Sequence, residues 1–496
     1  MDNNDQKSLK QIIDHRIKKI NQLRNEGIEP YPYKFDKEHD ISYVLNSEKK
    51  LKDVSIALAG RIVSLRNMGK ACFMNIQDET EKIQLYIKNK LIGLNDYDKI
   101  VKNLDIGDII GITGILFRTK TNQLSLKVSS VTLLSKSLRP LPNIKEKDDH
   151  MFFAFDDKEN RYRYRHLDLI VNPQNKALFK KRSSIIYKIR EILNQKGFME
   201  VETPILQNMH GGASAKPFIT HHNTLGHDFY LRIAEELYLK RLLIGGFEKI
   251  YEIGKNFRNE GIDRTHNPEF TMLELYESYS DVTDMMNLCE KLIKDISKDL
   301  KLKTVTFMGN EIVLNKKFNK ISMNDLIQNE LGCDVLGMSN KQLYELCIKH
   351  KLKINKKMNF GQLFDKLFSS LIEPKLIQPT FVFDYPKSIS PLAKVHRGNN
   401  ELAERFELFI AGMEFANAFS ELNDPIDQKN RFQDQLELLK SGDEEAHQMD
   451  VDFIEAMEIG MPPTGGIGIG IDRLVMLLLE KDSIKDVILF PSLRNK

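Results

Sequence analysis

A proline-containing stretch near residue 140 does most to constrain how this chain can fold. Pro140 and Pro142 are followed by the run Arg161-Tyr162-Arg163-Tyr164-Arg165-His166. Proline interrupts regular secondary structure, so we place a domain boundary between residues 138 and 168. Short alternating segments precede this boundary, and a mixed helix and strand pattern follows it for roughly 330 residues. The sequence therefore predicts at least two domains.

Two basic segments each have a structural and a functional interpretation. Between Lys7 and Asn25, apolar residues recur at helical spacing, and Arg16 and several lysines lie on the opposite face. We predict an amphipathic helix whose polar face is solvated, slightly ahead of one that contacts an RNA backbone. The arginine–tyrosine run at 161–166 fits nucleic-acid contact and a linker packed by salt bridges equally well.

Period-two alternation predicts β-strands between residues 55 and 134. Cys72, Met74 and Ile76 alternate with residues of the opposite face, as do Ile83, Leu85 and Ile87, which is typical of strands with one buried side. A helix-like stretch near 91–104 separates three early strands from two later ones, near 109–117 and 124–134. This order predicts a five-stranded OB barrel, a fold that often binds single-stranded nucleic acid.

Phe73 lies among polar positions on the outer side of one predicted strand. An aromatic ring there could stack on a base, with Arg66 as a phosphate or base-edge donor and Gln84 as an amide that reads a base. An ordinary surface aromatic is the alternative, and the local sequence favours neither.

Composition excludes several classes of protein. No apolar run approaches the ~20 residues that a membrane span needs, and residues 1–10 lack the apolar core of a signal peptide. The four cysteines form no CxxC pair, which predicts a reducing, cytoplasmic setting without disulfides or structural zinc. The net charge of +3 gives no global positive field, so a nucleic acid would have to be held by local basic patches.

Two sequence blocks of the second domain combine helices, strands and polar side chains. The first has a helical pattern over 183–194, a C-capping Gly197 and a strand over 198–201. In the second, a strand ends in Phe257-Arg258-Asn259-Glu260, a polar loop follows, and a strand runs from 270 to 279. Four residues of that strand share one face by parity: Phe270, Met272, Glu274 and Tyr276. Arg258 offers a bidentate fork for a phosphate or carboxylate.

The third block, residues 462–479, alternates glycines and then becomes an apolar helix. A dinucleotide-binding motif would need a βαβ unit around Gly468 and Gly470, and none follows so close to residue 496. Glycines that alternate along a strand instead leave one face bare, so that a flat ring can lie against the backbone. Arg473 begins the helix, where a phosphate tail could lie.

These three blocks, in this order, resemble motifs 1, 2 and 3 of the class II aminoacyl-tRNA synthetases. Gly211-Gly212-Ala213, the segment 234–237 and the segment 417–422 are similar to lysyl-tRNA synthetases in particular. The resemblance covers nearly the whole chain and implies an α+β fold: an N-terminal five-stranded OB barrel that binds the anticodon, and a class II catalytic domain with an antiparallel sheet flanked by helices. We accordingly expect a helix and connector at 1–54, the barrel at 55–140, a linker at 141–172 and the catalytic domain at 173–496.

The same resemblance implies a cytoplasmic homodimer, formed through motif 1, that joins L-lysine to tRNA(Lys) with ATP and Mg²⁺ and has no membrane partner. Lysine carries two ammonium groups, and burying an ammonium without a partner costs several kcal/mol. A lysine-selective pocket therefore needs carboxylates at both ends. The residues so implied are Gly212 and Glu236 for the α-amino end, Glu421 with Tyr276 and Glu274 for the ε-ammonium, and Asn417 and Phe419 as a wall on the strand of Glu421.

The resemblance also implies in-line attack of the lysine carboxylate on the α-phosphorus of ATP, which gives lysyl-adenylate. Arg258 would bind the carboxylate and the α-phosphate, Glu260 would read the adenine amino edge, and His266 would hold the phosphate tail. Phe270 and Arg473 would sandwich the adenine. We therefore predict Arg258, His266 and Arg473 as the catalytic residues.

Two glutamates predict a magnesium site. Residues 406–421 have the pattern of two strands joined near Ile410-Ala411-Gly412, and a tight turn there would place Glu407 opposite Glu414. Facing carboxylates repel each other, and a divalent cation between them would remove the conflict. Ile410-Ala411 is poor turn chemistry, so a shifted register is the alternative. The resemblance favours the metal.

Three other functions compete with this prediction. A same-class synthetase selective for aspartate or asparagine would need a basic residue where Glu421 stands. A paralogue that lysylates a protein would lack the OB domain. A non-catalytic regulatory paralogue that binds tRNA would be expected to lose Arg258, Glu414 or Arg473, and all three are present.

Overall fold

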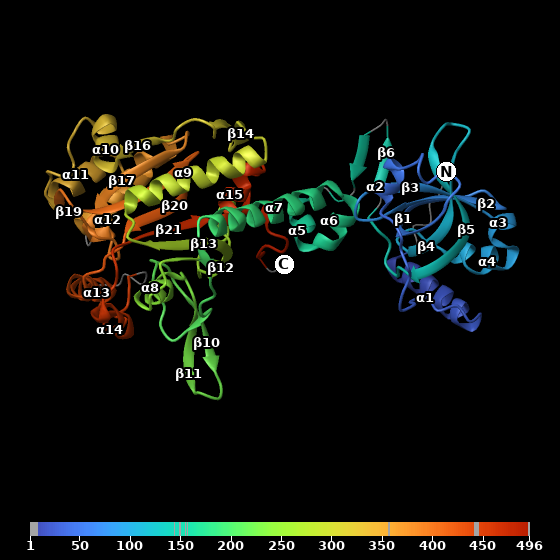
Figure 1. Ribbon diagram of the computed structural model, residues 1–496, viewed down its shortest axis with the longest axis horizontal. Coiled ribbons are helices and arrows are strands. Elements are labelled where there is room, and N and C mark those ends of the chain that lie inside the picture. The colour runs from blue at the N-terminus through green and yellow to red at the C-terminus, as the bar shows by residue number, and fades with distance from the viewer. Residues whose placement is uncertain are drawn as a thin grey trace. The chain divides into compact units, whose positions relative to one another are not determined.

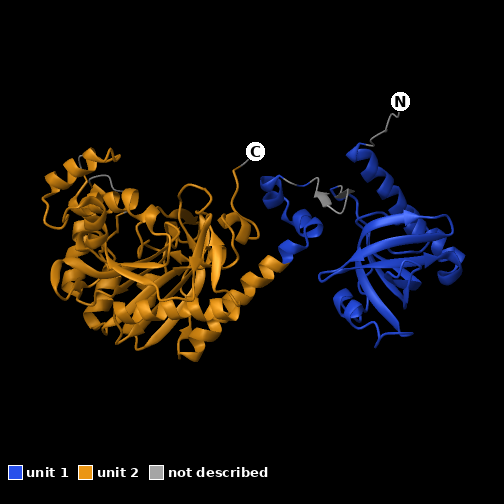
Figure 2. Cartoon of the chain, turned by 90° about the horizontal axis from the view of Figure 1, so that it is seen from above, with its two compact units in different colours: residues 1–176 blue, residues 177–496 orange. Residues whose placement is uncertain are grey.

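The computed structural model describes residues 8–142, 144–147, 150–153, 155, 157–355, 358–440 and 446–494. The chain divides into two compact units, residues 1–176 and 177–496 (Figure 2). Helix α7 (Gln174–Gln195) begins at the end of the first unit and continues into the second. Within the described residues, no helix has the length and apolar character that crossing a membrane requires.

Unit 1 contains the predicted five-stranded barrel, closed in the order β1-β2-β3-β5-β4 (Figure 1). Cys72, Met74 and Ile76 point into its core, as the alternation predicts. The elements of the barrel are β1 (Ser55–Asn67), β2 (Ala71–Gln77), β3 (Lys82–Lys88), α3 (Asn89–Ile92), α4 (Leu94–Lys99), the 3₁₀ turn η1 (Val101–Asn103), β4 (Ile109–Arg118) and β5 (Leu124–Ser135). The helix-like stretch is thus two short helices and a 3₁₀ turn.

The N-terminal helix α1 (Leu9–Asn25) packs differently from the prediction. Arg16 is buried and donates hydrogen bonds to the carbonyls of Ser137, Arg139 and Ile106. Leu9 and Ile17 are exposed instead. The assignment of Arg16 to a solvated face was wrong, because unpaired loop carbonyls offer its guanidinium better partners than water does. Lys7 lies outside the described residues.

The rest of unit 1 is α2 (Ile41–Asn46), β6 (Ile144–Lys147), β7 (His150–Phe153), α5 (Lys158–Arg163) and α6 (Arg165–Val171). Two arginines of the arginine–tyrosine run are ion-paired here. Arg161 Nε and Arg165 NH1 each lie 2.8 Å from a carboxylate oxygen of Asp168, which is buried. These contacts favour the packed linker over nucleic-acid contact for both arginines.

Unit 2 is built on a nine-stranded sheet, ordered β16-β17-β19-β20-β21-β13-β12-β8, with β18 paired to β19. Its strands are β8 (Met199–Glu200), β12 (Lys249–Phe257), β13 (Glu269–Ser278), β16 (Asn319–Ser322), β17 (Thr380–Pro386), β18 (Val395–His396), β19 (Asn399–Ile410), β20 (Met413–Ser420) and β21 (Thr464–Gly470). The inner strands pair antiparallel, as implied. The terminal strands β8 and β16 pair parallel with their neighbours.

Helices cover the sheet and leave one region of it open. The long helix α9 (Val282–Asp299) and α15 (Ile471–Leu478) cover one face and share its main apolar core with α7 (Figure 1). A second core joins β17 to helices α10 (Met323–Leu331), α11 (Asn340–Lys349) and α12 (Phe360–Leu371). The remaining elements are β9 (Leu206–Gln207), β10 (Phe218–His222), β11 (His227–Leu231), α8 (Glu236–Ile244), β14 (Thr304–Phe307), β15 (Asn310–Val313), η2 (Glu373–Lys375), η3 (Lys387–Ile389), α13 (Pro425–Lys440), α14 (Val451–Ile459) and α16 (Ile484–Val487).

Candidate active site

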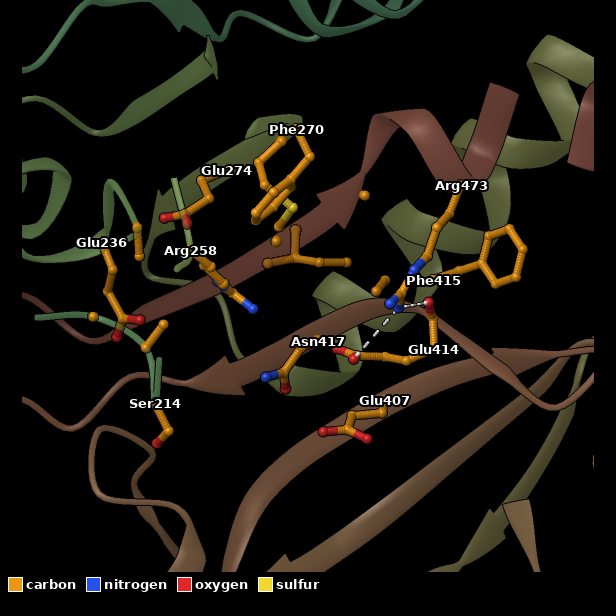
Figure 3. Close-up of a pocket in the computed structure, with 18 of the residues that line it drawn as sticks. Ser214, Glu236, Arg258, Phe270, Glu274, Glu407, Glu414, Phe415, Asn417 and Arg473 are labelled. Atoms are coloured by element: carbon orange, nitrogen blue, oxygen red, sulfur yellow. Dashed lines mark hydrogen bonds and ion pairs between the residues drawn. The ribbon is translucent and has the colours of Figure 1, made fainter. Parts of the chain in front are cut away.

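A cavity of about 400 Å³ lies over the middle strands of the unit 2 sheet. Figure 3 shows Glu236 and Glu274 at one end of it, and Glu414 with Arg473 at the other. All the predicted lysine, ATP and metal residues line this cavity: Gly212, Glu236, Arg258, Glu260, His266, Phe270, Glu274, Tyr276, Glu407, Glu414, Asn417, Phe419, Glu421 and Arg473. The residues that the sequence analysis predicted for lysine, ATP and the metal therefore lie in one pocket.

Glycines of β21 form the floor of the cavity between two strands that carry its functional side chains. Gly468 lies between Glu274 on β13 and Asn417 on β20. In the next row, Gly466 lies between Tyr276 and Phe419. A Cβ on Gly466 would meet Glu421 Oε1 at 2.0 Å and the Tyr276 ring at 2.5 Å. Only glycine therefore leaves room for these groups.

Glu421 ends the deep side of the pocket with a buried carboxylate, whose Oε2 lies 2.5 Å from Lys240 Nζ. The residue is 1% exposed, and neither carboxylate oxygen accepts a hydrogen bond of good geometry from the described residues. Burial raises the pKa of Glu421 to about 8, aided by Glu236 and opposed by Lys240. A buried carboxylate that lacks hydrogen bonds is a strong acceptor for a cationic ligand.

Glu236 is the first residue of α8 and lies beside Gly212. Gly212 has a φ of +85°, and a Cβ there would come within 3.0 Å of the Glu236 Cβ, so this position requires glycine. Glu236 Oε1 accepts a 2.5 Å hydrogen bond from Lys240 Nζ. Lys240 was absent from the sequence prediction, although its i, i+4 spacing from Glu236 on a helix is a signal for an ion pair.

Glu274 and Tyr276 complete the acidic end. The Tyr276 hydroxyl donates to Glu274 Oε2 at 3.2 Å. Burial, with Glu235 and Glu236 nearby, raises the pKa of Glu274 well above its usual range. Glu235 itself is buried, accepts a hydrogen bond from Asn256 Nδ2 at 2.6 Å and lies 3.4 Å from Arg232 NH2. This end of the pocket is suited to a ligand that brings positive charge.

Arg258 and Phe270 lie between the two ends of the cavity. The Arg258 guanidinium lies over the Phe270 ring, 5.2 Å from its centroid. Its Nε is buried and donates no hydrogen bond within the described part of the chain. An unsatisfied guanidinium donor is a ready partner for an anionic oxygen. In this structure, Arg258 thus lies against the Phe270 ring.

Arg473 and His266 contact each other at the open end. Arg473 NH1 donates to the Glu414 carbonyl at 2.6 Å, and its NH2 lies 3.2 Å from His266 Nε2. The other His266 nitrogen lies 2.9 Å from Asp263 Oδ2. Although burial opposes it, hydrogen bonds from Thr265 and His266 lower the pKa of Asp263 to about 2. Asp263, which the sequence prediction missed, thus orients the imidazole from the same loop.

The register predicted for the Glu407–Glu414 hairpin was wrong. Ala411 and Gly412 form the two-residue turn, with φ of +51° and +69°, so Ile410 pairs with Met413 and Phe409 pairs with Glu414. The register then shifts at Leu408, and Glu407 pairs with Asn417. This bulge reverses parity, so that Glu414 shares the pocket face with Asn417. The two glutamates therefore face one cavity without being direct cross-strand partners.

Glu407 has protein partners that the sequence prediction did not foresee. It is ion-paired with Arg405, and its Oε2 accepts a 2.9 Å hydrogen bond from the Tyr385 hydroxyl. Burial and Glu414 raise the pKa of Glu407 to about 7, whereas Arg405 lowers it. Loss of Glu407 would therefore leave Arg405 without its carboxylate partner.

The candidate nucleic-acid surface in unit 1 is a stripe of three rings on the barrel. Phe73 pairs in register with Arg66 on β1 and with Tyr86 on β3, and its ring centroid lies 5.0 Å from that of Tyr86. Tyr86 in turn lies 5.9 Å from the Phe117 ring. Gln84 is on the same side, where it accepts a hydrogen bond from Ser125 Oγ. Tyr86 and Phe117 were missed, although the parity of Tyr86 with Gln84 could have indicated the first.

Two family models match the chain. The tRNA synthetases class II (D, K and N) match residues 157–494, and the OB-fold nucleic acid binding domain matches residues 56–134. Similar curated proteins include the lysine–tRNA ligase of Carboxydothermus hydrogenoformans, 50% identical over 98% of this chain and 99% of the relative. Those of Pelotomaculum thermopropionicum and Halalkalibacterium halodurans are 50% and 47% identical, over 99% and 98% of this chain and 96% and 98% of the relatives.

Proposed function

The chain belongs to the lysine–tRNA ligases of the class II tRNA synthetases, and we propose that its unit 2 cavity activates L-lysine with ATP and transfers it to tRNA(Lys). The observation that carries this proposal is the buried carboxylate of Glu421, ion-paired with Lys240, at the end of a pocket that also holds an unsatisfied arginine donor. Such a pair fits a ligand with an ammonium at one end and an anionic group at the other.

Lysine would lie along the glycine floor of β21. Its α-amino group would meet Glu236 beside Gly212, and its ε-ammonium would meet Glu421, with Tyr276 and Glu274 alongside. Asn417 and Phe419 would form the wall next to the aliphatic stem. A site selective for aspartate would need an unpaired cation here. The described cations at this end, Lys240 and Arg232, are each ion-paired with two glutamates.

Arg258 would hold the lysine carboxylate and the α-phosphate of ATP together, which offsets their repulsion and stabilises the charge that develops during in-line displacement. The bond from the carboxylate oxygen to the α-phosphorus forms as the bond to the pyrophosphate oxygen breaks. Phe270 and Arg473 would pack on the adenine, Glu260 would read its amino edge, and His266 would hold the phosphate tail. Binding of ATP would then replace the present contact between Arg473 and His266.

Glu407 and Glu414 both line the cavity. Among the described residues, no group of three or more His, Cys, Asp or Glu side chains is placed to hold a metal ion. Glu414 and Glu407 would hold Mg²⁺, which commonly takes one or two carboxylates together with substrate phosphates. A bound Mg²⁺ neutralises charge on those phosphates.

We assign residues 55–140 to anticodon binding, residues 1–54 to the preceding helix and connector, 141–172 to a linker and 173–496 to catalysis. Arg66, Phe73 and Gln84, together with Tyr86 and Phe117, would read the anticodon by stacking and polar contacts. The terminal adenosine of the tRNA would accept the lysyl group from the adenylate, with release of AMP.

Phe73→Ala is expected to weaken tRNA charging by about 1–3 kcal/mol, the value of one base stack. Lysyl-adenylate formation should be unchanged, because its residues lie in unit 2. Kinetics of aminoacylation and of pyrophosphate exchange measure the two steps separately. Tyr33→Ala, which removes a fully exposed ring of unit 1, is the matched control. Equal loss in both assays would indicate misfolding, and full charging activity would make Phe73 an ordinary surface ring.

We also propose a homodimer formed through motif 1 and a cytoplasmic location. Four apolar residues of or near this motif are exposed, namely Tyr187, Met199, Ile205 and Leu206, and β8 is an edge strand. Exposed apolar groups at a sheet edge favour burial against another chain. Light scattering coupled to gel filtration would measure the mass, and a monomer at micromolar concentration would contradict the dimer.

ATP–pyrophosphate exchange with each of the twenty amino acids tests the proposed activity. Exchange should depend on lysine far more than on any other amino acid. Exchange with aspartate or asparagine would overturn the lysine assignment. A chain that binds tRNA but exchanges with no amino acid would instead be the non-catalytic paralogue.

A further inference from the structure

Lys240 places a second ammonium inside the pocket proposed for lysine. Its side chain is fully buried, and Nζ lies 2.5 Å from both Glu236 Oε1 and Glu421 Oε2. Glu236 is on the same helix, whereas Glu421 follows β20, 181 positions along the chain. One protein ammonium thus bridges the carboxylates proposed for the α-amino and the ε-ammonium groups of the substrate.

A buried ammonium carries a large desolvation cost, which neighbouring carboxylates must offset. Burial lowers the pKa of Lys240, but Glu236 and Glu421 outweigh this effect, so the pKa is raised and Lys240 remains charged. The described titratable groups around this cluster are Glu235 and Glu236 at the start of α8, Glu274 and Tyr276 on β13, Glu421 after β20, and His210 and His447. Burial lowers the pKa of His447 to about 4, with His210 and Lys240 adding to the effect, so His447 is uncharged at neutral pH.

The charges at this end can be compared with those of the substrate. Glu235 is balanced by Arg232, whose NH2 lies 3.4 Å away. Glu236, Glu274 and Glu421 carry three negative charges when ionised, and Lys240 cancels one. The remaining two equal the charges of the α-amino and ε-ammonium groups, while the substrate carboxylate would meet Arg258. Without Lys240, a carboxylate at this end would have to be protonated or paired with another cation, because an isolated buried charge is too costly.

We propose that Lys240 is a positioning residue for lysine recognition: it supplies the shared counter-charge of Glu236 and Glu421 and so fits the pocket to a doubly charged amino acid. This inference rests on the proposed function, because it assigns lysine to the same cavity. If Lys240 has this role, its loss should change lysine binding in a way that depends on pH, whereas loss of a purely structural residue should not.

The sign of the pH effect follows from Glu421. Its carboxyl group is protonated below its pKa and cannot then pair with the ε-ammonium. The pKa of about 8 already includes the lowering by Lys240, so loss of Lys240 moves this pKa upward. Lysine KM should therefore fall as pH rises through that value, and in the variant the fall should occur at higher pH.

Lys240→Met, which keeps the aliphatic length without the charge, tests the proposal by pyrophosphate exchange between about pH 6.5 and 8.5. At pH 7 we expect lysine KM to rise about tenfold or more, since each unit of pKa change is a tenfold change in ionisation. The kcat and the KM for ATP should change less than about threefold, because Arg258 and the ATP residues are untouched. Selectivity for lysine over its uncharged analogue norleucine should fall.

Lys294→Met is the matched control, since Lys294 also pairs with a glutamate one helical turn away, Glu290, at 2.5 Å, but lies on α9 outside the cavity. Its lysine KM and pH profile should equal those of the unmodified chain. An unshifted pH profile in Lys240→Met, or equal changes in lysine and ATP KM, would overturn the proposal.

A double variant keeps the test decisive if Lys240→Met folds poorly. In the Glu421→Gln background only the Glu236 carboxylate still needs Lys240, so adding Lys240→Met should raise lysine KM by a smaller factor than it does in the unmodified chain. Independent, multiplicative losses would contradict the shared counter-charge. The unmodified chain separates the proposed function from the role of Lys240. If the unmodified chain shows no lysine-dependent exchange, the proposed function fails. If it shows normal exchange and the Lys240 variants are unaffected, only the role of Lys240 fails.

Discussion

Glu421→Gln is expected to lower kcat/KM for lysine activation by at least ~2–3 kcal/mol, because it removes a buried, charge-assisted contact to the ε-ammonium. Both oxygens of this carboxylate lack hydrogen bonds of good geometry from the described residues. An amide at the same position would offer one acceptor and would turn an NH₂ group toward Lys240 or toward the substrate. Pyrophosphate exchange at varied lysine concentration measures the loss.

The KM for ATP should be unaffected by this substitution, because Glu421 lies at the end of the cavity away from Arg473. Glu437→Gln is a suitable control, since Glu437 is an exposed partner of Lys440 on α13 and such pairs contribute little. Near-normal kcat/KM for lysine in Glu421→Gln would remove this residue from the recognition of lysine.

Parity explains why much of the cavity could be predicted from the sequence. Side chains alternate between the faces of a regular strand, so Phe270, Glu274 and Tyr276 had to share a face once β13 was recognised. The same argument placed Asn417 with Glu421. It required no knowledge of neighbouring strands. β13 is regular over these residues, and β20 is regular from Ala416 to Ser420, one residue before Glu421.

Register could not be predicted in the same way. The turn between β19 and β20 uses Ala411 at a φ of +51°, a conformation that a sequence rule assigns to glycine or asparagine. The bulge beside Leu408 then depends on packing of both strands in the sheet. Because the position of the turn was predicted wrongly, the predicted cross-strand partner of Glu407 was also wrong. The bulge nevertheless places Glu414 on the face of the sheet that lines the pocket.

Contacts between distant segments were also beyond the sequence. The i, i+4 spacing could have paired Lys240 with Glu236, but its contact with Glu421 exists only because α8 packs beside the end of β20. Arg16 is a similar case, since its three carbonyl partners lie in loops about 90 to 123 positions away. Helical periodicity shows which residues share one face of a helix, but it does not show which segments of the chain pack against that face.

Glu414→Ala is expected to reduce adenylate formation at ordinary Mg²⁺ concentration at least about a hundredfold, since even outer-shell metal partners contribute 10–100-fold. The fold should persist, with a stability change within about 0.5 kcal/mol. The Glu414 side chain is 42% exposed, and the 2.6 Å contact with Arg473 NH1 uses its backbone carbonyl, which alanine retains. Glu407→Ala is a poorer probe, because it removes the carboxylate partner of Arg405, whose side chain is only 14% exposed, and so is expected to destabilise the fold as well.

The dependence on Mg²⁺ distinguishes a metal ligand from a partner of Arg473. If Glu414 holds the cation, the Mg²⁺ concentration for half-maximal exchange should rise at least about tenfold in Glu414→Ala, and added Mg²⁺ should restore part of the rate by mass action. Glu401→Ala, an exposed glutamate on β19, should leave this concentration unchanged. Its carboxylate lies on the same hairpin but not in the cavity. A large loss of rate with an unaltered Mg²⁺ dependence would contradict the metal site at Glu407 and Glu414. It would mean that Glu414 acts by orienting the Arg473 guanidinium, 3.8 Å away.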